Sequence, residues 1–137
     1  MKRKLSLIIA TIILLSSILS LSVSANDGIE LFNNNTASIH TAFVINDSGL
    51  AIVSVNCIGY PNITTRIEVD VHIEKRNFLF FWENARHEIY VVYVDEYFDE
   101  HTYQLEEKGT YRCTVTYTVS GTGGEDDVFT YQETDSW

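Results

Sequence analysis

The sequence predicts an all-β protein, in which seven or eight short antiparallel strands form a sandwich of two sheets. Residues 108–119 alternate apolar and polar side chains without a break. Because successive strand residues face opposite sides of a sheet, this segment is expected to be a strand with one buried and one solvated face. Residues 65–74 repeat the pattern, and turn-forming residues separate the apolar runs at regular spacing.

Residues 1–25 have the layout of a cleaved secretory signal peptide. Three basic residues precede an apolar run that begins at Leu5, and residues 23–25 offer small side chains at the two positions that a signal peptidase reads. The alternative is an uncleaved membrane anchor, since residues 5–23 approach the ~20 apolar residues that span a bilayer. Five serines between positions 16 and 24 favour cleavage. We therefore expect a secreted, extracellular protein with no stable membrane insertion after signal cleavage.

Beyond the signal, residues 26–36 are predicted to form a flexible lead-in and residues 37–137 a single domain. The signal would remove three of the nine basic residues and none of the nineteen acidic ones, so the net charge changes from −10 to −13. Such an acidic surface repels nucleic acid and anionic membrane surfaces, which excludes them as partners. It is compatible with cationic partners, with calcium or with simple solubility. A monomer is expected.

The two cysteines, Cys57 and Cys113, are an even number in a chain expected to reach an oxidising compartment. This predicts one disulfide bond, with two free buried thiols as the alternative. A zinc site would need more ligands than two isolated cysteines supply, and no cofactor is predicted.

The first predicted hairpin joins residues 38–45 to residues 50–58 through the turn-forming residues 46–49. The second of these strands places Cys57 on its apolar face. The sole proline, Pro61, lies in the turn that follows, where it costs no ladder hydrogen bond. The third predicted strand, residues 65–74, has its apolar side chains at odd positions.

The middle of the chain is rich in aromatic residues. Residues 78–82 form a dense apolar run, whose outward half would be exposed unless another segment covers it. Residues 83–86 are polar and are the part of the chain most compatible with a helix. Residues 89–94 are apolar on both faces, which predicts a strand covered on each side. The remaining predicted elements are an acidic turn at 95–100, strands at 101–105, 108–119 and 128–132, and a glycine-rich acidic loop at 120–127.

The segment from Gly109 to Cys113 resembles the start of strand F in immunoglobulin-like domains. In those domains a tyrosine two residues before the cysteine fixes the preceding loop, and the cysteine is bonded to one on strand B. The resemblance implies a tyrosine corner at Tyr111 and an inter-sheet disulfide between Cys57 and Cys113. Antibody-type domains carry a tryptophan on the third strand, but residues 65–74 contain none. The expected architecture is therefore immunoglobulin-like or fibronectin III-like and not antibody-type.

Most of residues 38–131 also resembles small secreted proteins of Gram-positive bacteria. The shared features are the signal peptide, an aliphatic third strand, Trp82 in the following hairpin and the segment from Lys108 to Arg112. This resemblance implies the fold and a secreted location, and it implies no activity.

The sequence predicts no catalytic residue and no metal site. Asp126 and Asp127 are candidate calcium ligands, but their loop lacks the spacing of a calcium motif, as does the acidic turn at 95–100. The four histidines are scattered without metal-binding spacing, and no serine lies in a nucleophile motif. The protein is therefore not expected to be an enzyme.

The aromatic side chains between positions 78 and 103 predict the function. Some of them must be core, and an exposed remainder would stack on sugar rings or dock a partner. The candidate binding residues are Phe80, Trp82, Tyr90 and Tyr93. We predict a non-enzymatic binding or adhesion module for an unidentified protein or glycan ligand at the cell surface. The alternatives are a carbohydrate-binding module that uses exposed aromatics, and a structural or inhibitory secreted protein.

Overall fold

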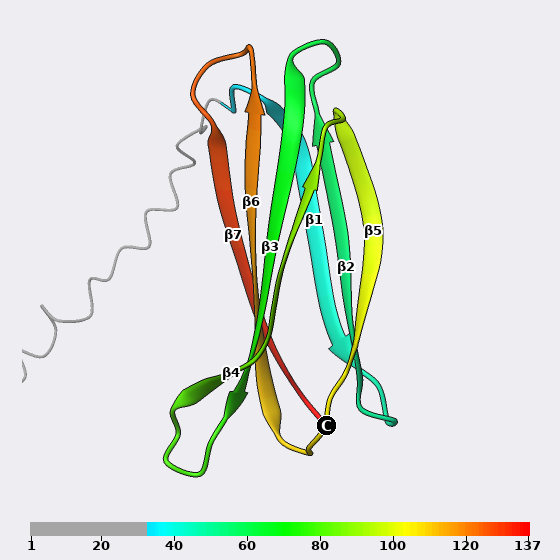
Figure 1. The fold of residues 1–137 in the computed structure, drawn as a ribbon, viewed down its shortest axis with the longest axis vertical. Helices are drawn as coiled ribbons and strands as arrows, with labels where there is room; N and C mark the ends of the chain where they lie inside the picture. Colours follow the sequence, from blue (N-terminus) through cyan, green and yellow to red (C-terminus); the bar gives the residue numbers. More distant parts are fainter. Residues whose placement is uncertain (1–32) are drawn as a thin grey trace, which may run out of the picture. The chain divides into compact units, whose positions relative to one another are not determined.

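The structure, a computed structural model, describes residues 33–137 and folds them into seven strands (Figure 1). The strands are β1 (Thr36–Ile45), β2 (Leu50–Gly59), β3 (Thr64–Arg76), β4 (Trp82–Val92), β5 (Glu96–Gln104), β6 (Thr110–Gly121) and β7 (Asp127–Ser136). The predicted all-β class is therefore confirmed. The signal peptide predicted for residues 1–25 lies outside the described residues. Among the described residues, none form a helix that could cross a membrane.

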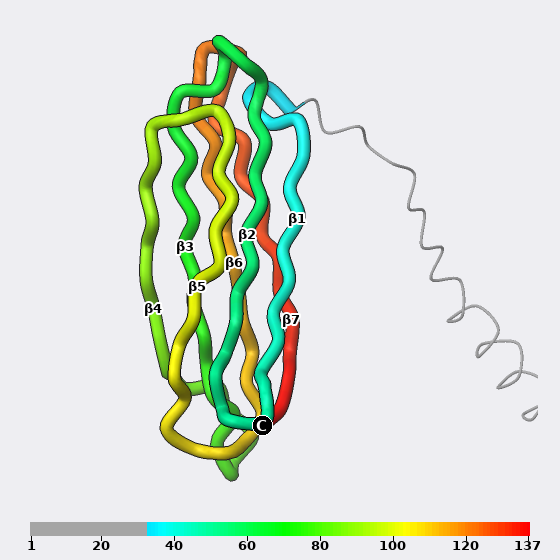
Figure 2. The backbone as a smooth tube through the Cα atoms, turned by 90° about the vertical axis from the view of Figure 1, so that its right-hand side faces the viewer, coloured from blue at the N-terminus to red at the C-terminus, as the bar shows by residue number. Residues whose placement is uncertain are grey.

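The strands form two antiparallel sheets that pack face to face (Figures 1 and 2). One sheet has three strands in the order β1-β2-β5, and the other has four in the order β4-β3-β6-β7. In constant-type immunoglobulin domains the fourth strand lies in the sheet of the first, second and fifth strands. Here β4 instead pairs with β3, although its residues 83–86 were predicted to be compatible with a helix. The chain is therefore an immunoglobulin-like sandwich that differs from the constant type in the position of its fourth strand.

The core lies between the sheets and follows the alternation of the sequence. Every second residue of β2, β3 and β6 is buried. A hydrogen bond of 2.7 Å joins the hydroxyls of Tyr117 on β6 and Thr41 on β1, so the fully buried Tyr117 has a partner on the facing sheet. Burial raises the pKa of Tyr117 to about 12.

Tyr111 starts the buried face of β6 and fixes the turn before it. Its side chain is buried, and its hydroxyl donates a 2.5 Å hydrogen bond to the backbone oxygen of Glu107. This is the geometry of a tyrosine corner. Gly109, in the same turn, exchanges two backbone hydrogen bonds with Trp137, which ties the end of the chain to this corner.

The predicted disulfide is absent, because Cys57 and Cys113 are both buried free thiols. They share the core but lie at different levels of the sandwich. Cys113 pairs with Glu133, whose carboxylate accepts a hydrogen bond from the amide of Phe43. Phe43 in turn pairs with Val53, so Cys113 is level with Val53. Cys57 is four residues further along β2, about 13 Å away at the rise of a strand, whereas a disulfide needs Cα atoms within about 7 Å.

The two thiols are expected to resist alkylation in the folded protein. Burial raises the pKa of Cys57 to about 11 and that of Cys113 to about 12, so the reactive thiolate at pH 8 is at least about a hundredfold scarcer than in an unfolded chain. Mass spectrometry after maleimide treatment should show no label on the native protein and two labels after unfolding without reductant. A mass that gains no label after unfolding would show that the disulfide forms after all.

The edge of β1 is covered by acidic side chains of β7, which runs beside it (Figure 2). The amide of Phe43 donates to the Glu133 carboxylate at 3.3 Å, and the amide of Ile45 donates to the Asp135 carboxylate at 2.7 Å. Unpaired edge amides otherwise invite pairing with another chain. β7 therefore closes this side of the sandwich with side chains, without a continuous ladder of backbone hydrogen bonds.

The fold begins earlier than the predicted domain boundary at residue 37. Asn34 and Asn35 donate their amides to the Asp127 carboxylate at 2.9 and 2.7 Å. The side chain of Asn35 is fully buried, donates to the backbone oxygens of Val119 and Glu125, and accepts from the amide of Gly123. These residues, assigned to a flexible lead-in from the sequence, therefore attach the start of β1 to the loop between β6 and β7.

Candidate binding surface at the β3–β4 hairpin

The turn between β3 and β4 presents the aromatic run at one end of the sandwich. We call residues 77–81 the hairpin tip. The side-chain oxygen of Asn77 accepts hydrogen bonds from the amides of Leu79 at 2.9 Å and Phe81 at 3.0 Å. The backbone of Asn77 also pairs with Phe80 and Phe81 across the turn, at 3.0 and 2.8 Å. Asn77 thus organises the tip, because a side chain of this type imitates the backbone in a tight turn.

All four large apolar side chains of the hairpin tip are exposed. The exposed fractions are 87% for Phe78, 57% for Leu79, 71% for Phe80 and 67% for Phe81. No segment among the described residues covers the outward half of this aromatic run, which is therefore exposed. The four exposed side chains are consecutive in the sequence.

Phe80 adopts a backbone conformation that favours glycine. Its φ of 67° lies in the left-handed region, which costs a residue with a side chain about 1 kcal/mol or more. A glycine at this position would relieve the cost, so the aromatic side chain is present in spite of the backbone. Phe80 therefore combines an exposed aromatic side chain with a backbone conformation that favours glycine.

Cationic and aromatic side chains surround the base of the hairpin tip. The guanidinium of Arg76 lies 4.7 Å from the centre of the Phe80 ring, and that of Arg112 lies 4.5 Å from a ring of Trp82. Both distances are typical of cation–π contacts. Arg112 also donates to the Glu74 carboxylate at 2.9 and 2.5 Å. We call Arg76, Trp82 and Arg112 the collar.

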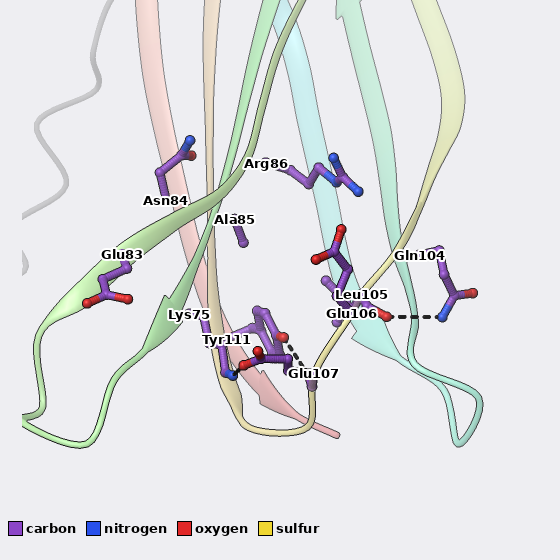
Figure 3. A pocket seen from close by; sticks show the side chains of 10 residues that line it. All are labelled: Lys75, Glu83, Asn84, Ala85, Arg86, Gln104, Leu105, Glu106, Glu107 and Tyr111. Atoms are coloured by element: carbon purple, nitrogen blue, oxygen red, sulfur yellow. Dashed lines mark hydrogen bonds and ion pairs between the residues drawn. The ribbon is translucent and has the colours of Figure 1, made fainter.

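A small cavity lies beside the collar, between β4 and β5 (Figure 3). Its volume of about 220 Å³ is below the range typical of ligand pockets. An ion pair between Lys75 and Glu107 lies in it, and the hydrogen bond from Lys75 lowers the pKa of Glu107 and raises that of Lys75. Tyr111 and Leu105 line its inner side. Because this cavity is small and its lysine is already paired with Glu107, it is not the candidate site.

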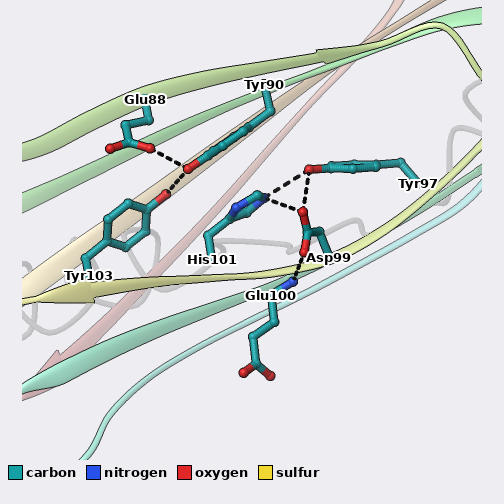
Figure 4. A network of polar contacts seen from close by, with 7 residues as sticks. All are labelled: Glu88, Tyr90, Tyr97, Asp99, Glu100, His101 and Tyr103. Atoms are coloured by element: carbon teal, nitrogen blue, oxygen red, sulfur yellow. Dashed lines mark hydrogen bonds and ion pairs between the residues drawn. The ribbon is translucent and has the colours of Figure 1, made fainter.

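The candidate binding residue Tyr90 belongs to the side of the sandwich and not to the tip (Figure 4). Its ring stacks on His101 with centroids 3.7 Å apart, and its hydroxyl bonds the hydroxyl of Tyr103 at 2.8 Å and the carboxylate of Glu88 at 2.5 Å. Tyr97 also belongs to this network, because its hydroxyl lies 3.2 Å from His101 Nε2. Burial, followed by the hydrogen bond to Glu88, raises the pKa of Tyr90. The network joins β4 to β5 and is structural.

The remaining candidates are also separated. Tyr93 is 78% exposed but follows β4 at the opposite end of the sandwich from the tip. A β-bulge, in which Ile73 pairs with Arg86 and Glu74 with Asn84, leaves Ala85 as an extra residue on β4. Because one extra residue reverses the alternation, Trp82 faces outward while Tyr90 points into the sandwich. Of the four candidates, Phe80 and Trp82 belong to the tip and its base, and Tyr90 and Tyr93 lie elsewhere.

The candidate metal ligands do not converge. Asp126 is exposed, and the buried carboxylate of Asp127 is occupied by the amides of Asn34 and Asn35. Between residues 33 and 137, no group of three or more histidine, cysteine or acidic side chains is placed to hold a metal ion.

No family model and no curated protein matches the chain. Among solved structures, the CARDB domain of a protein from Pyrococcus furiosus, determined in complex with di-metal ions, is 18% identical with a TM-score of 0.42, over 77% of this chain and 90% of that one. A β-glucosidase from Listeria innocua in complex with isofagomine is 16% identical with a TM-score of 0.40, over 70% of this chain and 16% of that one. These similarities are weak. The immunoglobulin-like assignment rests on the strand order and the facing sheets.

Three residues that organise the candidate surface are absent from the set predicted from sequence. Asn77 forms the turn, and Arg76 and Arg112 contact the aromatic rings. A signal for Asn77 is present, because asparagine is favoured at the start of turns and a long strand precedes it. Arg112 gave no such signal, because its proximity to Trp82 depends on the pairing of β6 with β3 and of β3 with β4.

Proposed function

We propose that the chain is a secreted, non-enzymatic binding module that contacts its partner through the hairpin tip. The observation that carries the proposal is the exposure of four consecutive large apolar side chains on a turn held by hydrogen bonds. Exposed apolar clusters on small proteins commonly mark interaction sites. The left-handed conformation of Phe80 adds support, since it keeps an aromatic side chain where glycine would be favoured. Secretion is supported by the layout of residues 1–25.

The carbohydrate-binding alternative has less support from the geometry. A flat sugar-binding platform requires several aromatic faces in one plane and open to solvent. Arg112 covers one face of Trp82, and His101 covers one face of Tyr90. These two rings also project from opposite faces of their sheet.

The proposal is tested by a matched pair of triple variants. Phe78→Ser, Phe80→Ser and Phe81→Ser together remove the aromatic side chains of the tip. The control variant replaces three exposed apolar residues elsewhere on the domain with serine: Val44, Phe98 and Val128. Each immobilised variant is exposed to culture surface fractions that contain membranes, wall material and proteins.

We expect the tip variant to lose the bound material and the control to retain it at the wild-type level. Equal thermal unfolding midpoints would show that both variants are folded. If the control loses binding while the tip variant keeps it, the contact surface lies elsewhere and the proposal is wrong.

A further inference from the structure

We propose that the hairpin tip inserts into the interface of a zwitterionic lipid bilayer. This inference rests on the proposed function and names the partner of the same surface. The tip would enter the boundary between headgroups and acyl chains without spanning the membrane, as amphipathic segments with exposed aromatic residues do.

The arrangement of the tip side chains favours a lipid surface over a protein groove. Phe78, Leu79, Phe80 and Phe81 are all more than half exposed, so none of the four is covered by the rest of the domain. A groove on a protein would cover the side of the turn that faces it. A lipid interface covers a small protruding group from all sides, which matches this distribution.

Four of the five backbone amides of the tip have a hydrogen-bond partner within the turn. The amides of Asn77, Leu79, Phe80 and Phe81 are hydrogen-bonded within the turn. An amide that enters an apolar phase without a partner opposes insertion. The side-chain oxygen of Asn77 accepts two of these hydrogen bonds, and its NH₂ group donates to Glu83 at 2.6 Å.

The charges near the tip are balanced, in contrast to the acidic chain as a whole. Around its base, Glu74 and Glu107 form ion pairs with Arg112 and Lys75, and Glu83 accepts a hydrogen bond from the uncharged Asn77 amide. These three carboxylates are matched in number by the cations Arg112, Lys75 and Arg76. Arg76 has no carboxylate partner among the described residues and lies on Phe80. The local balance suits a zwitterionic headgroup layer, whereas the net charge of −10 opposes an anionic one.

With the tip inserted, the collar would lie at the level of the lipid headgroups. Tryptophan and arginine side chains concentrate at membrane interfaces because an apolar body is joined to a polar end. The tip reaches farther than the neighbouring turns at its end of the sandwich in both views (Figures 1 and 2), so those turns do not block contact with a flat surface.

The test uses the chain recovered from culture medium and an environment-sensitive nitrobenzoxadiazole label at Phe80→Cys. The label goes to this position because the thiols of Cys57 and Cys113 are buried. A second protein carries the label at Val128→Cys, an exposed site at the start of β7 and at the opposite end of the sandwich. Both are titrated with phosphatidylcholine vesicles and with vesicles that also contain phosphatidylglycerol.

We expect the label at position 80 to brighten and shift to shorter wavelength with phosphatidylcholine, and the label at position 128 to remain unchanged. The unlabelled triple serine variant of the tip should partition at least about a hundredfold more weakly than the wild type in vesicle flotation, since each large apolar side chain contributes about tenfold. Phosphatidylglycerol should weaken the partition. The residues before the domain are the same in the wild type and in the triple variant, so they would not produce a difference in flotation between the two.

No response at position 80, or equal flotation of the triple variant, would overturn the lipid assignment. If the tip variant nevertheless loses capture of a protein or of wall material, the proposed binding function stands with a different partner. If the tip variant keeps both vesicle binding and capture, the lipid assignment and the proposed binding function are both wrong.

Discussion

The free energy of unfolding is expected to fall steeply once the pH rises above about 9. In the folded protein, burial raises the pKa of Cys57 from 9.0 to about 11 and that of Cys113 from 9.0 to about 12. The unfolded chain therefore releases these protons first, which stabilises it relative to the folded chain. The contribution of each thiol is complete below pH 9 and is lost as the pH approaches the folded value. At about 1.4 kcal/mol per pH unit, Cys57 costs about 2 kcal/mol and Cys113 about 3 kcal/mol by pH 11.

Denaturant titrations between pH 7 and 12 measure this effect. Tyr117, whose pKa burial raises to about 12, adds to the loss above pH 10. The double variant Cys57→Ala and Cys113→Ala should have a shallower dependence between pH 9 and 11, even though its packing at neutral pH is poorer. An unchanged slope in the double variant would assign the alkaline transition to other groups.

Asp127→Ala is expected to destabilise the domain by about 3 kcal/mol. The substitution removes a buried carboxylate that accepts the amides of Asn34 and Asn35, and charge-assisted hydrogen bonds of this kind are worth about 1.5–3 kcal/mol each. It also releases the start of β1 from the loop between β6 and β7. Chemical denaturation of the variant and the wild type measures the difference.

Asp126→Ala is the matched control, because Asp126 is adjacent in sequence and exposed. We expect a change within about 0.5 kcal/mol for this variant. Equal stabilities of the Asp127→Ala and Asp126→Ala proteins would mean that the contact with Asn34 and Asn35 contributes little.

The strands could be predicted from sequence because alternation determines which side chains face the core. Ile67, Val69, Val71 and Ile73 are all buried, as their odd positions indicated. Alternation does not determine how far along the sandwich a residue lies. Cys57 and Cys113 both face inward as predicted, yet pairing of the strands places them at different levels, so the disulfide prediction was wrong.

The candidate surface was predicted only in part, because a single bulge changed the geometry. Trp82 and Tyr90 are an even number of residues apart, and a regular strand would put both on one face. The extra residue Ala85 puts them on opposite faces, and no local feature of the sequence marked it. The exposure of Phe80 depends likewise on the turn formed by Asn77, which takes the aromatic run beyond the end of the sheets.

Asn35 and the hairpin tip lie at opposite ends of β3, so the length of this strand sets the distance between them. Asn35 accepts a hydrogen bond from the Thr64 hydroxyl at the start of β3, and the tip follows Arg76 at the end of the same strand. β3 has 13 residues, which corresponds to about 43 Å of extended chain. Asn35 is therefore held about one strand length from the hairpin tip. A contact made at the tip would therefore lie the full length of β3 away from the residues that begin the fold.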